Sequence, residues 1–324
     1  MRDIQAGTEG FPKIAIDKVG VRNIELPVTI HRPNTDETFS TVAIMSSYCD
    51  LVEDLKGINM SRISRTLVPI FTKEKGFVTD LSRKAVNELA AAHDTDNVYL
   101  KLKFKYTWDS ASPQTEIDSP EIANVEIETH LSGRETKQYM TVETVGMSLC
   151  PCSKEMSLFV NNLNEGEKKI FDGWKKNGND LWPAMKSLVK KLEMAGFGAH
   201  NQKSYVKATV ELKEGELLYI EDLVDLINAC VSAQTYSILK RPDEKYVTEV
   251  SYMSGYIDEQ KNLVELDGYG PKFVEDIVRQ VADKLNTIMD KTIKDYVVVV
   301  RNEESIHSQD IEAVAVLNAG RSLH

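Results

Sequence analysis

The chain has 324 residues, which is enough for two domains or for one domain built from two similar halves. Its composition is 42% hydrophobic and 27% charged, and its net charge of −11 argues against a general nucleic-acid binder, which needs a concentrated excess of lysine and arginine. The first thirty residues hold no apolar stretch of signal-peptide length, and the longest aliphatic run is only residues 297–300, so we expect a soluble, cytoplasmic protein without a membrane partner.

The first half of the chain predicts four strands around two helices. Strand-like runs cover residues 18–30, 38–48, 97–108 and 123–131. Apolar residues at helical spacing predict one helix over 59–73, where Pro69 should break or kink it, and a second over 80–94. Thr79 or Asp80 is the expected N-cap of the second helix.

The second half repeats this order of elements. Strands are predicted over residues 135–147, 204–212, 295–303 and 312–318, and helices within 220–240 and 271–290. Repetition at this scale predicts an α+β fold of two tandem ββααββ modules, residues 1–133 and 134–324, each an antiparallel sheet with helices on one face. One module alone leaves its sheet edges open, so we expect closure into a larger oligomeric barrel.

Residues 157–195 do not fit the repeated order of strands and helices in the second half. They predict a lysine-rich helical pair with glycine and asparagine breakers between its halves. We interpret them as an insertion on the module surface. A solvated helical hairpin is the simpler interpretation, and a lid is the alternative, since the segment joins two candidate site segments.

Five polar segments carry reactive residue types at the ends of predicted strands or helices, where functional sites gather. They are residues 148–155, 196–204, 239–249, 270–276 and 304–310. The first holds Cys150 and Cys152, and the residues alone leave three interpretations: a metal ligand, a nucleophilic thiol or a buried structural pair. Cys49 and Cys230 lie in apolar runs that are typical of core positions.

Two histidines and two glutamates stand out in the other four segments. His200 has glycine and polar neighbours that make a core position implausible, and a plain loop histidine is the alternative. Glu244 follows a predicted helix in a loop, where a solvated charge is the simplest interpretation. Glu275 projects away from the apolar stripe of its helix. His307 follows the acidic pair Glu303 and Glu304, a setting that suits either a proton carrier or an exposed histidine.

Read together, these segments resemble the signature segments of one family in the same order. The resemblance rests on LCPCSKE (149–155), GAHNQKS (198–204), the run at 217–249 that ends in RPDEKYVTE, PKFVEDIVR (271–279) and ESIH (304–307), with support at 19–30 and 56–62. They are similar to the type IB GTP cyclohydrolases, members of the tunnelling fold. The similarity covers most of the chain outside the insertion.

The resemblance implies a reaction and an assembly. GTP and water would give formate and 7,8-dihydroneopterin triphosphate, at the entry to folate-type pterins. The family has two tandem modules in each chain, and it assembles as a homotetramer with active sites at subunit interfaces. An interface would also give the outward-facing Glu275 a function.

Residue by residue, the resemblance makes Cys150, His200 and Glu244 the ligands of a divalent metal ion, which could be zinc, manganese or iron(II). Such an ion lowers the pKa of a bound water that can attack C8 of guanine. His307 matches the catalytic histidine and acts with Cys150 in catalysis. Glu275 matches the anchor that accepts hydrogen bonds from guanine N1–H and the 2-amino group.

Lys154 and Lys203 flank two of these ligands and are the first candidates for contacts with the triphosphate. The chain departs from the family pattern at Asn59 and Gln309, where the family commonly has histidine, so a two-histidine proton relay is in question. Two other enzymes stay open as alternatives. They are an archaeal-type cyclohydrolase that forms a cyclic phosphate pterin, and a nitrile reductase with a cysteine nucleophile. A non-catalytic protein of the same fold is the third alternative.

Overall fold

The computed structural model describes residues 10, 12–33, 35–158, 165–166, 172–173, 176 and 198–320. The insertion predicted at 157–195 lies almost wholly outside the described residues and stays a prediction. Within the described residues, we find no helix with the length and apolar character needed to cross a membrane.

The N-terminal half follows the predicted order of strands and helices. Its elements are β1 (Ile16–His31), β2 (Thr38–Leu51), α1 (Met60–Lys73), α2 (Val78–His93), β3 (Asn97–Ala111) and β4 (Asp118–Ser132). The strands alternate between a buried and an exposed face. In β3, Leu100 and Leu102 are fully buried, while Lys101 and Lys103 point to the opposite face and pair with Glu126 of β4. Burying each such leucine contributes roughly 1.5–3 kcal/mol.

The C-terminal half keeps the same frame and adds elements to it. The frame consists of β5 (Glu135–Leu149), β6 (Asn201–Leu212), α6 (Ile220–Asn228), α8 (Val274–Asn286), β10 (Ile293–Glu303) and β11 (Glu312–Asn318). The additions are α3 (Pro151–Ser157), β7 (Ala233–Gln234), α7 (Arg241–Met253), β8 (Gly255–Ile257) and β9 (Leu263–Glu265). The predicted α+β fold class with two tandem ββααββ modules is therefore confirmed.

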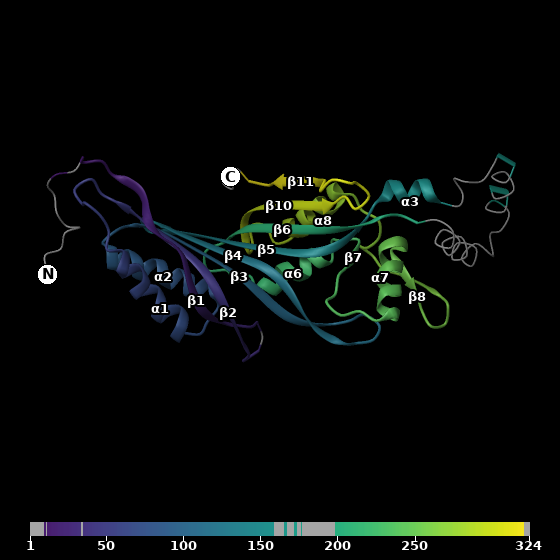
Figure 1. Cartoon of the computed structure of the whole chain (residues 1–324), viewed down its shortest axis with the longest axis horizontal. Helices are drawn as coiled ribbons and strands as arrows, with labels where there is room; N and C mark the ends of the chain where they lie inside the picture. Colours follow the sequence, from purple (N-terminus) through teal and green to yellow (C-terminus); the bar gives the residue numbers. More distant parts are fainter. Residues whose placement is uncertain are drawn as a thin grey trace.

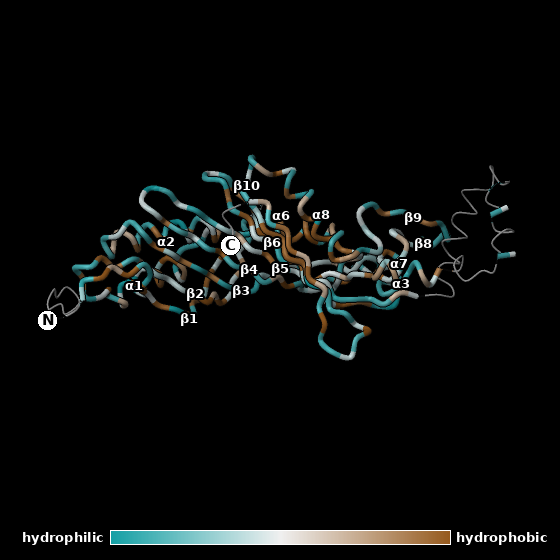
Figure 2. Tube along the Cα trace, turned by 90° about the horizontal axis from the view of Figure 1, so that it is seen from above, coloured by the Kyte–Doolittle hydropathy of each residue, from teal (hydrophilic) through white to brown (hydrophobic). Residues whose placement is uncertain are grey.

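Both modules share one antiparallel sheet. The strand order is β1-β2-β3-β4-β5-β6-β10-β11, with β7 paired to β5, and the modules join where β4 pairs with β5. Helices α1 and α2 lie along the N-terminal half and α6 and α8 along the C-terminal half (Figure 1). Buried residues of both halves form one continuous core. Apolar residues concentrate where β5 and β6 run beside α6 and α8 (Figure 2).

Three local predictions need correction. Helix α1 is not broken at Pro69, because buried Leu67 and Ile70 on either side keep its apolar face on the sheet. Helix α2 begins earlier than predicted, with Phe77 as the N-cap, so Thr79 and Asp80 lie inside its first turn. The third error is that the segment after residue 240, predicted as a loop, is helix α7.

The start of α7 explains why this helix was missed. Pro242 is tolerated in the first turn of a helix because no intrahelical partner exists there for its missing N–H. The Asp243 carboxylate accepts the backbone N–H of Lys240 at 2.9 Å and so caps the helix start. The same residues that suggest a loop by composition therefore begin a helix.

Candidate active site

Cys150 and His200 lie side by side at the ends of two neighbouring strands. Strands β5 and β6 pair in a register that places Leu149 opposite Asn201. Cys150 and His200 are the next residues outward, and the Cys150 N–H donates to the His200 carbonyl at 3.3 Å. Strand pairing thus brings together two residues that lie fifty positions apart in the sequence.

The thiol of Cys150 caps the short helix α3. Its sulfur accepts the backbone N–H of Ser153 at 3.4 Å, and the residue is half-buried, whereas Cys152 is exposed. Lys154 fastens α3 to the end of α7, because its ammonium donates to the Tyr252 carbonyl at 2.6 Å and lies 4.8 Å from the centre of the Tyr252 ring. A phosphate-binding function of Lys154 stays a prediction.

The β10–β11 loop brings His307 to the same end of the sheet. Ser305 Oγ donates to the Asn201 carbonyl at 2.7 Å and lies 3.5 Å from Nδ1 of His200. His307 itself is exposed, and its backbone N–H donates to the Glu304 carbonyl at 3.3 Å. The predicted catalytic histidine therefore lies in a loop that is tied to the His200 segment.

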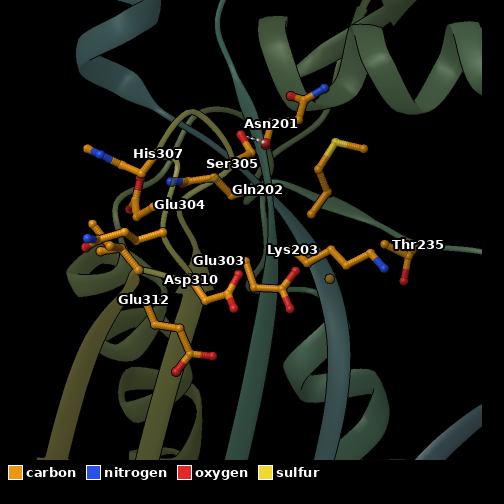
Figure 3. A pocket seen from close by; sticks show the side chains of 14 residues that line it. Asn201, Gln202, Lys203, Thr235, Glu303, Glu304, Ser305, His307, Asp310 and Glu312 are labelled. Atoms are coloured by element: carbon orange, nitrogen blue, oxygen red, sulfur yellow. Dashed lines mark hydrogen bonds between the residues drawn. The ribbon is translucent and has the colours of Figure 1, made fainter.

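A cavity of about 740 Å³ opens between this loop, β5 and the start of β6 (Figure 3). Its lining includes Lys203, His307, Glu303, Glu304, Asp310 and Glu312. Two of these carboxylates have partners, since Glu303 accepts the Tyr205 hydroxyl at 2.8 Å and Glu312 pairs with Arg301 at 2.9 Å. Lys203 is the only lysine or arginine that lines the cavity in the described part of the chain.

Glu275 lies in the first turn of α8, exposed as predicted. The helix start is joined to the end of β5: Lys272 N–H donates to the Leu149 carbonyl at 3.2 Å, and Ser148 Oγ donates to the Lys272 carbonyl at 3.0 Å. Glu275 is thus close in the fold to the Cys150 segment. It does not line the His307 cavity.

Glu244 lies apart from the other two predicted ligands. It is exposed in the first turn of α7, while Tyr252, which contacts α3, lies eight residues later in the same helix. At 1.5 Å per residue, that separation is roughly 12 Å along the helix axis. Among the described residues, no three histidine, cysteine, aspartate or glutamate side chains are grouped so that they could hold a metal ion.

The two remaining cysteines are core residues, as predicted. Burial raises the pKa of the Cys49 thiol to about 11, with a smaller contribution from Asp50, and burial raises that of Cys230 to about 11. A thiol with such a pKa is protonated at neutral pH and is a poor nucleophile or ligand.

Buried polar residues beneath these segments were not predicted from the sequence. Ser148, Ser204 and Asn302 have side chains on the helix-facing side of β5, β6 and β10, and none of them is more than 2% exposed. Lys272, just before α8, is 4% exposed. Ser148, Ser204 and Asn302 each place a polar side chain at an inward position of a strand where the alternation predicts an apolar one. That polar side chain was the signal in the sequence that could have identified them.

The family model that matches the chain is described as Type I GTP cyclohydrolase folE2, and the match covers residues 1–255 and 257–313. The chain belongs to this family. GTP cyclohydrolase FolE2 of Magnetococcus marinus is 29% identical over 321 residues, covering 99% of this chain and 97% of that protein. The proteins of the same name from Dictyoglomus turgidum and Syntrophotalea carbinolica are 31% and 32% identical, covering 96% and 97% of this chain and 95% and 94% of theirs.

Among solved structures, uricase from Arthrobacter globiformis overlaps 95% of this chain and 96% of that chain, with a TM-score of 0.49 and 8% identity. Membership of the type I GTP cyclohydrolase FolE2 family agrees with the coarser part of the resemblance described above. The finer assignment to type IB is part of the proposal that follows.

Proposed function

We propose that this chain is a type IB GTP cyclohydrolase, which converts GTP and water to 7,8-dihydroneopterin triphosphate and formate in cytoplasmic folate-type pterin synthesis. The observation that carries the proposal is the meeting of Cys150, His200 and the His307 loop at one end of β5, β6 and β10, in a chain of this family. These segments come from three distant parts of the sequence.

We also propose that Cys150, His200 and Glu244 hold a divalent metal ion. The thiol and the imidazole fit zinc, manganese or iron(II), and they are the pair that the strand register brings together. Glu244 does not join them within the described single chain. When bound, such an ion supplies Lewis acidity and lowers the pKa of the water that attacks C8.

The remaining residues bind substrate and move protons. The carboxylate of Glu275 is suited to accept hydrogen bonds from guanine N1–H and the 2-amino group, a pair of donors that adenine lacks. The imidazole of His307 would exchange protons with the purine ring nitrogens as the ring opens and formate leaves. Lys203 would contact the phosphates from the cavity.

The charges around the cavity support an assembled site. Four carboxylates and only one lysine line it in the described chain, whereas a triphosphate needs several cations. We therefore propose a homotetramer in which neighbouring subunits complete the substrate site. A contribution from a neighbouring subunit would also account for the separation of Glu244 from Cys150 and His200.

Two alternatives use the same residues differently. A cyclohydrolase that gives a cyclic phosphate pterin would share every residue named above and differ only in product. A nitrile reductase would use Cys150 or Cys152 as a nucleophile, and a helix-capping thiol such as Cys150 is compatible with that function. The family match favours the cyclohydrolases over the reductase.

The test is to add zinc, manganese or anaerobic iron(II) separately to metal-free protein with GTP, and to oxidise and chromatograph the fluorescent pterins before and after phosphatase treatment. The proposal predicts neopterin after phosphatase treatment with at least one metal, and no product from ATP. Direct chromatography of the phosphorylated product separates the triphosphate from a cyclic phosphate. Folded protein that gives neither pterin nor formate with any metal would refute the proposal.

A further inference from the structure

A continuous network of buried hydrogen bonds lies beneath the candidate site. Ser204 Oγ donates to Asn302 Oδ1 at 2.6 Å, Asn302 Nδ2 donates to Ser148 Oγ at 3.0 Å, and Ser148 Oγ donates to the Lys272 carbonyl at 3.0 Å. The three side chains in this hydrogen-bond network are at most 2% exposed. The network runs from β6 to β10, then to β5, and ends at the start of α8.

The direction of these bonds is fixed by chemistry. The Lys272 carbonyl can only accept, so the Ser148 hydroxyl must donate to it and can accept from the Asn302 amide. The other end of that amide is then the oxygen, which accepts the Ser204 hydroxyl. Reversing the amide would place its oxygen against the Ser148 oxygen, whose hydrogen is already donated to the Lys272 carbonyl, and two buried acceptors face to face are costly.

This hydrogen-bond network joins the segments that carry the candidate site residues. Ser148 is two residues from Cys150, and Ser204 is four residues from His200. Lys272 is three residues from Glu275. Asn302 lies between Ser148 and Ser204 in the hydrogen-bond network, and its side-chain amide bonds to both hydroxyls.

The loop before α8 is fixed from a second side. The Lys272 ammonium donates to the carbonyls of Cys230 at 2.7 Å, Val231 at 2.8 Å and Gly268. These carbonyls belong to the segment after α6 and to the loop itself. The Lys272 ammonium therefore holds the loop against the end of α6. The hydrogen-bond network that contains Asn302 holds the start of α8 against β5.

We propose that Asn302 is a positioning residue, whose side-chain amide fixes the first turn of α8, and with it Glu275, relative to the strand ends that carry Cys150 and His200. Its effect on the reaction is through nucleotide binding by Glu275. This inference rests on the proposed function, in which Glu275 binds guanine.

A matched buried amide lies near the start of β5, away from the candidate site residues, and bonds to the N-terminal module. Gln138 is 2% exposed, and its Nε2 donates to the carbonyl of Thr79, in the first turn of α2, at 2.8 Å and to Thr129 Oγ1 at 3.1 Å. A buried amide thus ties a strand to a helix start twice in the fold: Gln138 at α2 of the N-terminal module and, through Ser148, Asn302 at α8 of the C-terminal module. Gln138 supplies the control for a purely structural function of Asn302.

The experiment compares Asn302→Asp with Gln138→Glu, since both replace a buried amide by its isosteric acid. In Asn302→Asp the Ser148 hydroxyl would turn toward the new acid and leave the Lys272 carbonyl without a donor. GTP binding to metal-free protein is measured by calorimetry, metal affinity by chelator competition and amide exchange in α8 by mass spectrometry.

We expect Asn302→Asp to weaken GTP binding at least tenfold and to speed exchange in the first turn of α8, with metal affinity changed less than threefold. Gln138→Glu should lower the unfolding temperature because the Thr79 carbonyl loses its donor, although Arg83 can pair with the new carboxylate, and it should leave GTP affinity unchanged. Equal effects of both variants on GTP affinity would overturn the inference, and so would none from Asn302→Asp.

Two serine variants keep the test decisive if the acid variants do not fold. Ser148→Ala cuts the connection to α8, whereas Ser204→Ala cuts only the connection to β6. The inference predicts a larger loss of GTP affinity in Ser148→Ala, and equal losses would contradict it. Wild-type protein that neither binds nor converts GTP would instead refute the proposed function.

Discussion

At the scale of single residues, the buried ammonium of Lys272 gives a pH dependence with a definite sign. Burial lowers its pKa to about 8, against 10.5 for an exposed lysine. Between these values the unfolded chain carries a proton that the native chain lacks, so the free energy of unfolding rises with pH in this window.

The difference in unfolding free energy between wild type and Lys272→Met should therefore increase from pH 8 to pH 10, by roughly 1 kcal/mol per pH unit. Urea unfolding at pH 7.5, 8.5 and 9.5 measures it. The methionine variant also leaves three carbonyls without a donor, which costs stability at every pH. A difference that stays flat or shrinks above pH 8 would show that the ammonium is not buried as described.

The surroundings of individual candidate residues were predictable where local sequence marks them. Glycine and polar neighbours set His200 apart, and helical spacing placed Glu275 on an exposed face. Asn302 and Lys272 were not foreseen, because a lone buried amide or lysine has a meaning only once its partners in distant segments are known.

At the scale of elements, the β3–β4 hairpin of the first module holds the start of α7 in the second. Asp243 is fully buried and accepts the N–H groups of Gln114 at 2.8 Å and Thr115 at 2.9 Å, and the Thr115 hydroxyl at 2.6 Å. Burial would raise the pKa of this carboxyl, but the hydrogen bonds from Thr115, Lys240 and Gln114 together hold it well below its usual range.

Thr115→Ala should lower the unfolding temperature by about 3 °C and speed amide exchange in the first turn of α7, whereas Thr115→Ser should preserve both. Thr95→Ala is the matched control, because it removes a hydroxyl bond to Asp50 beyond the other end of β3. Mass spectrometry of exchanged peptides follows α7 directly. Faster exchange of α7 in Thr95→Ala as well would argue against a specific hairpin contact.

Strands were predicted better than helices for a physical reason. Alternation of buried and exposed residues is a local pattern, and it located β2, β3, β10 and β11 within a few residues of their ends. Helix α7 depends on the hairpin contact of Asp243 and on its own cap, neither of which shows as a periodic pattern.

At the scale of the whole molecule, the sheet has two open edges. In the described residues the strand order ends at β1 on one side and β11 on the other. Strand β11 also exposes Val314 and Val316, at 53% and 62%. Unpaired edges with exposed valines are stabilised by pairing with another chain, which agrees with the proposed tetramer.

We expect the wild-type protein to run as a homotetramer in light scattering at micromolar concentration. Val316→Lys should shift it toward smaller species and reduce cyclohydrolase activity at least tenfold, because a charge on the outermost strand opposes burial in an interface. Far-ultraviolet circular dichroism checks that the variant is folded. A fully active wild-type monomer would contradict the assembled site.

The repeat of the two modules was visible in sequence, but the site was not. Cys150 and His200 meet through strand pairing, whereas Glu244 lies at the far end of α7 from them. No periodic pattern in the sequence marks Glu244, so only the family resemblance could propose it as a ligand.

The most direct test of the central claim compares Cys150→Ala with Cys152→Ala, its exposed neighbour two residues away. Formate released from GTP labelled with carbon-14 at C8 is measured beside metal content, after loading with each metal. The account predicts that Cys150→Ala loses bound metal and at least a thousandfold in rate, while Cys152→Ala keeps both within about threefold of wild type. Equal activity of the two variants, or loss of activity in Cys150→Ala with full metal retention, would contradict it.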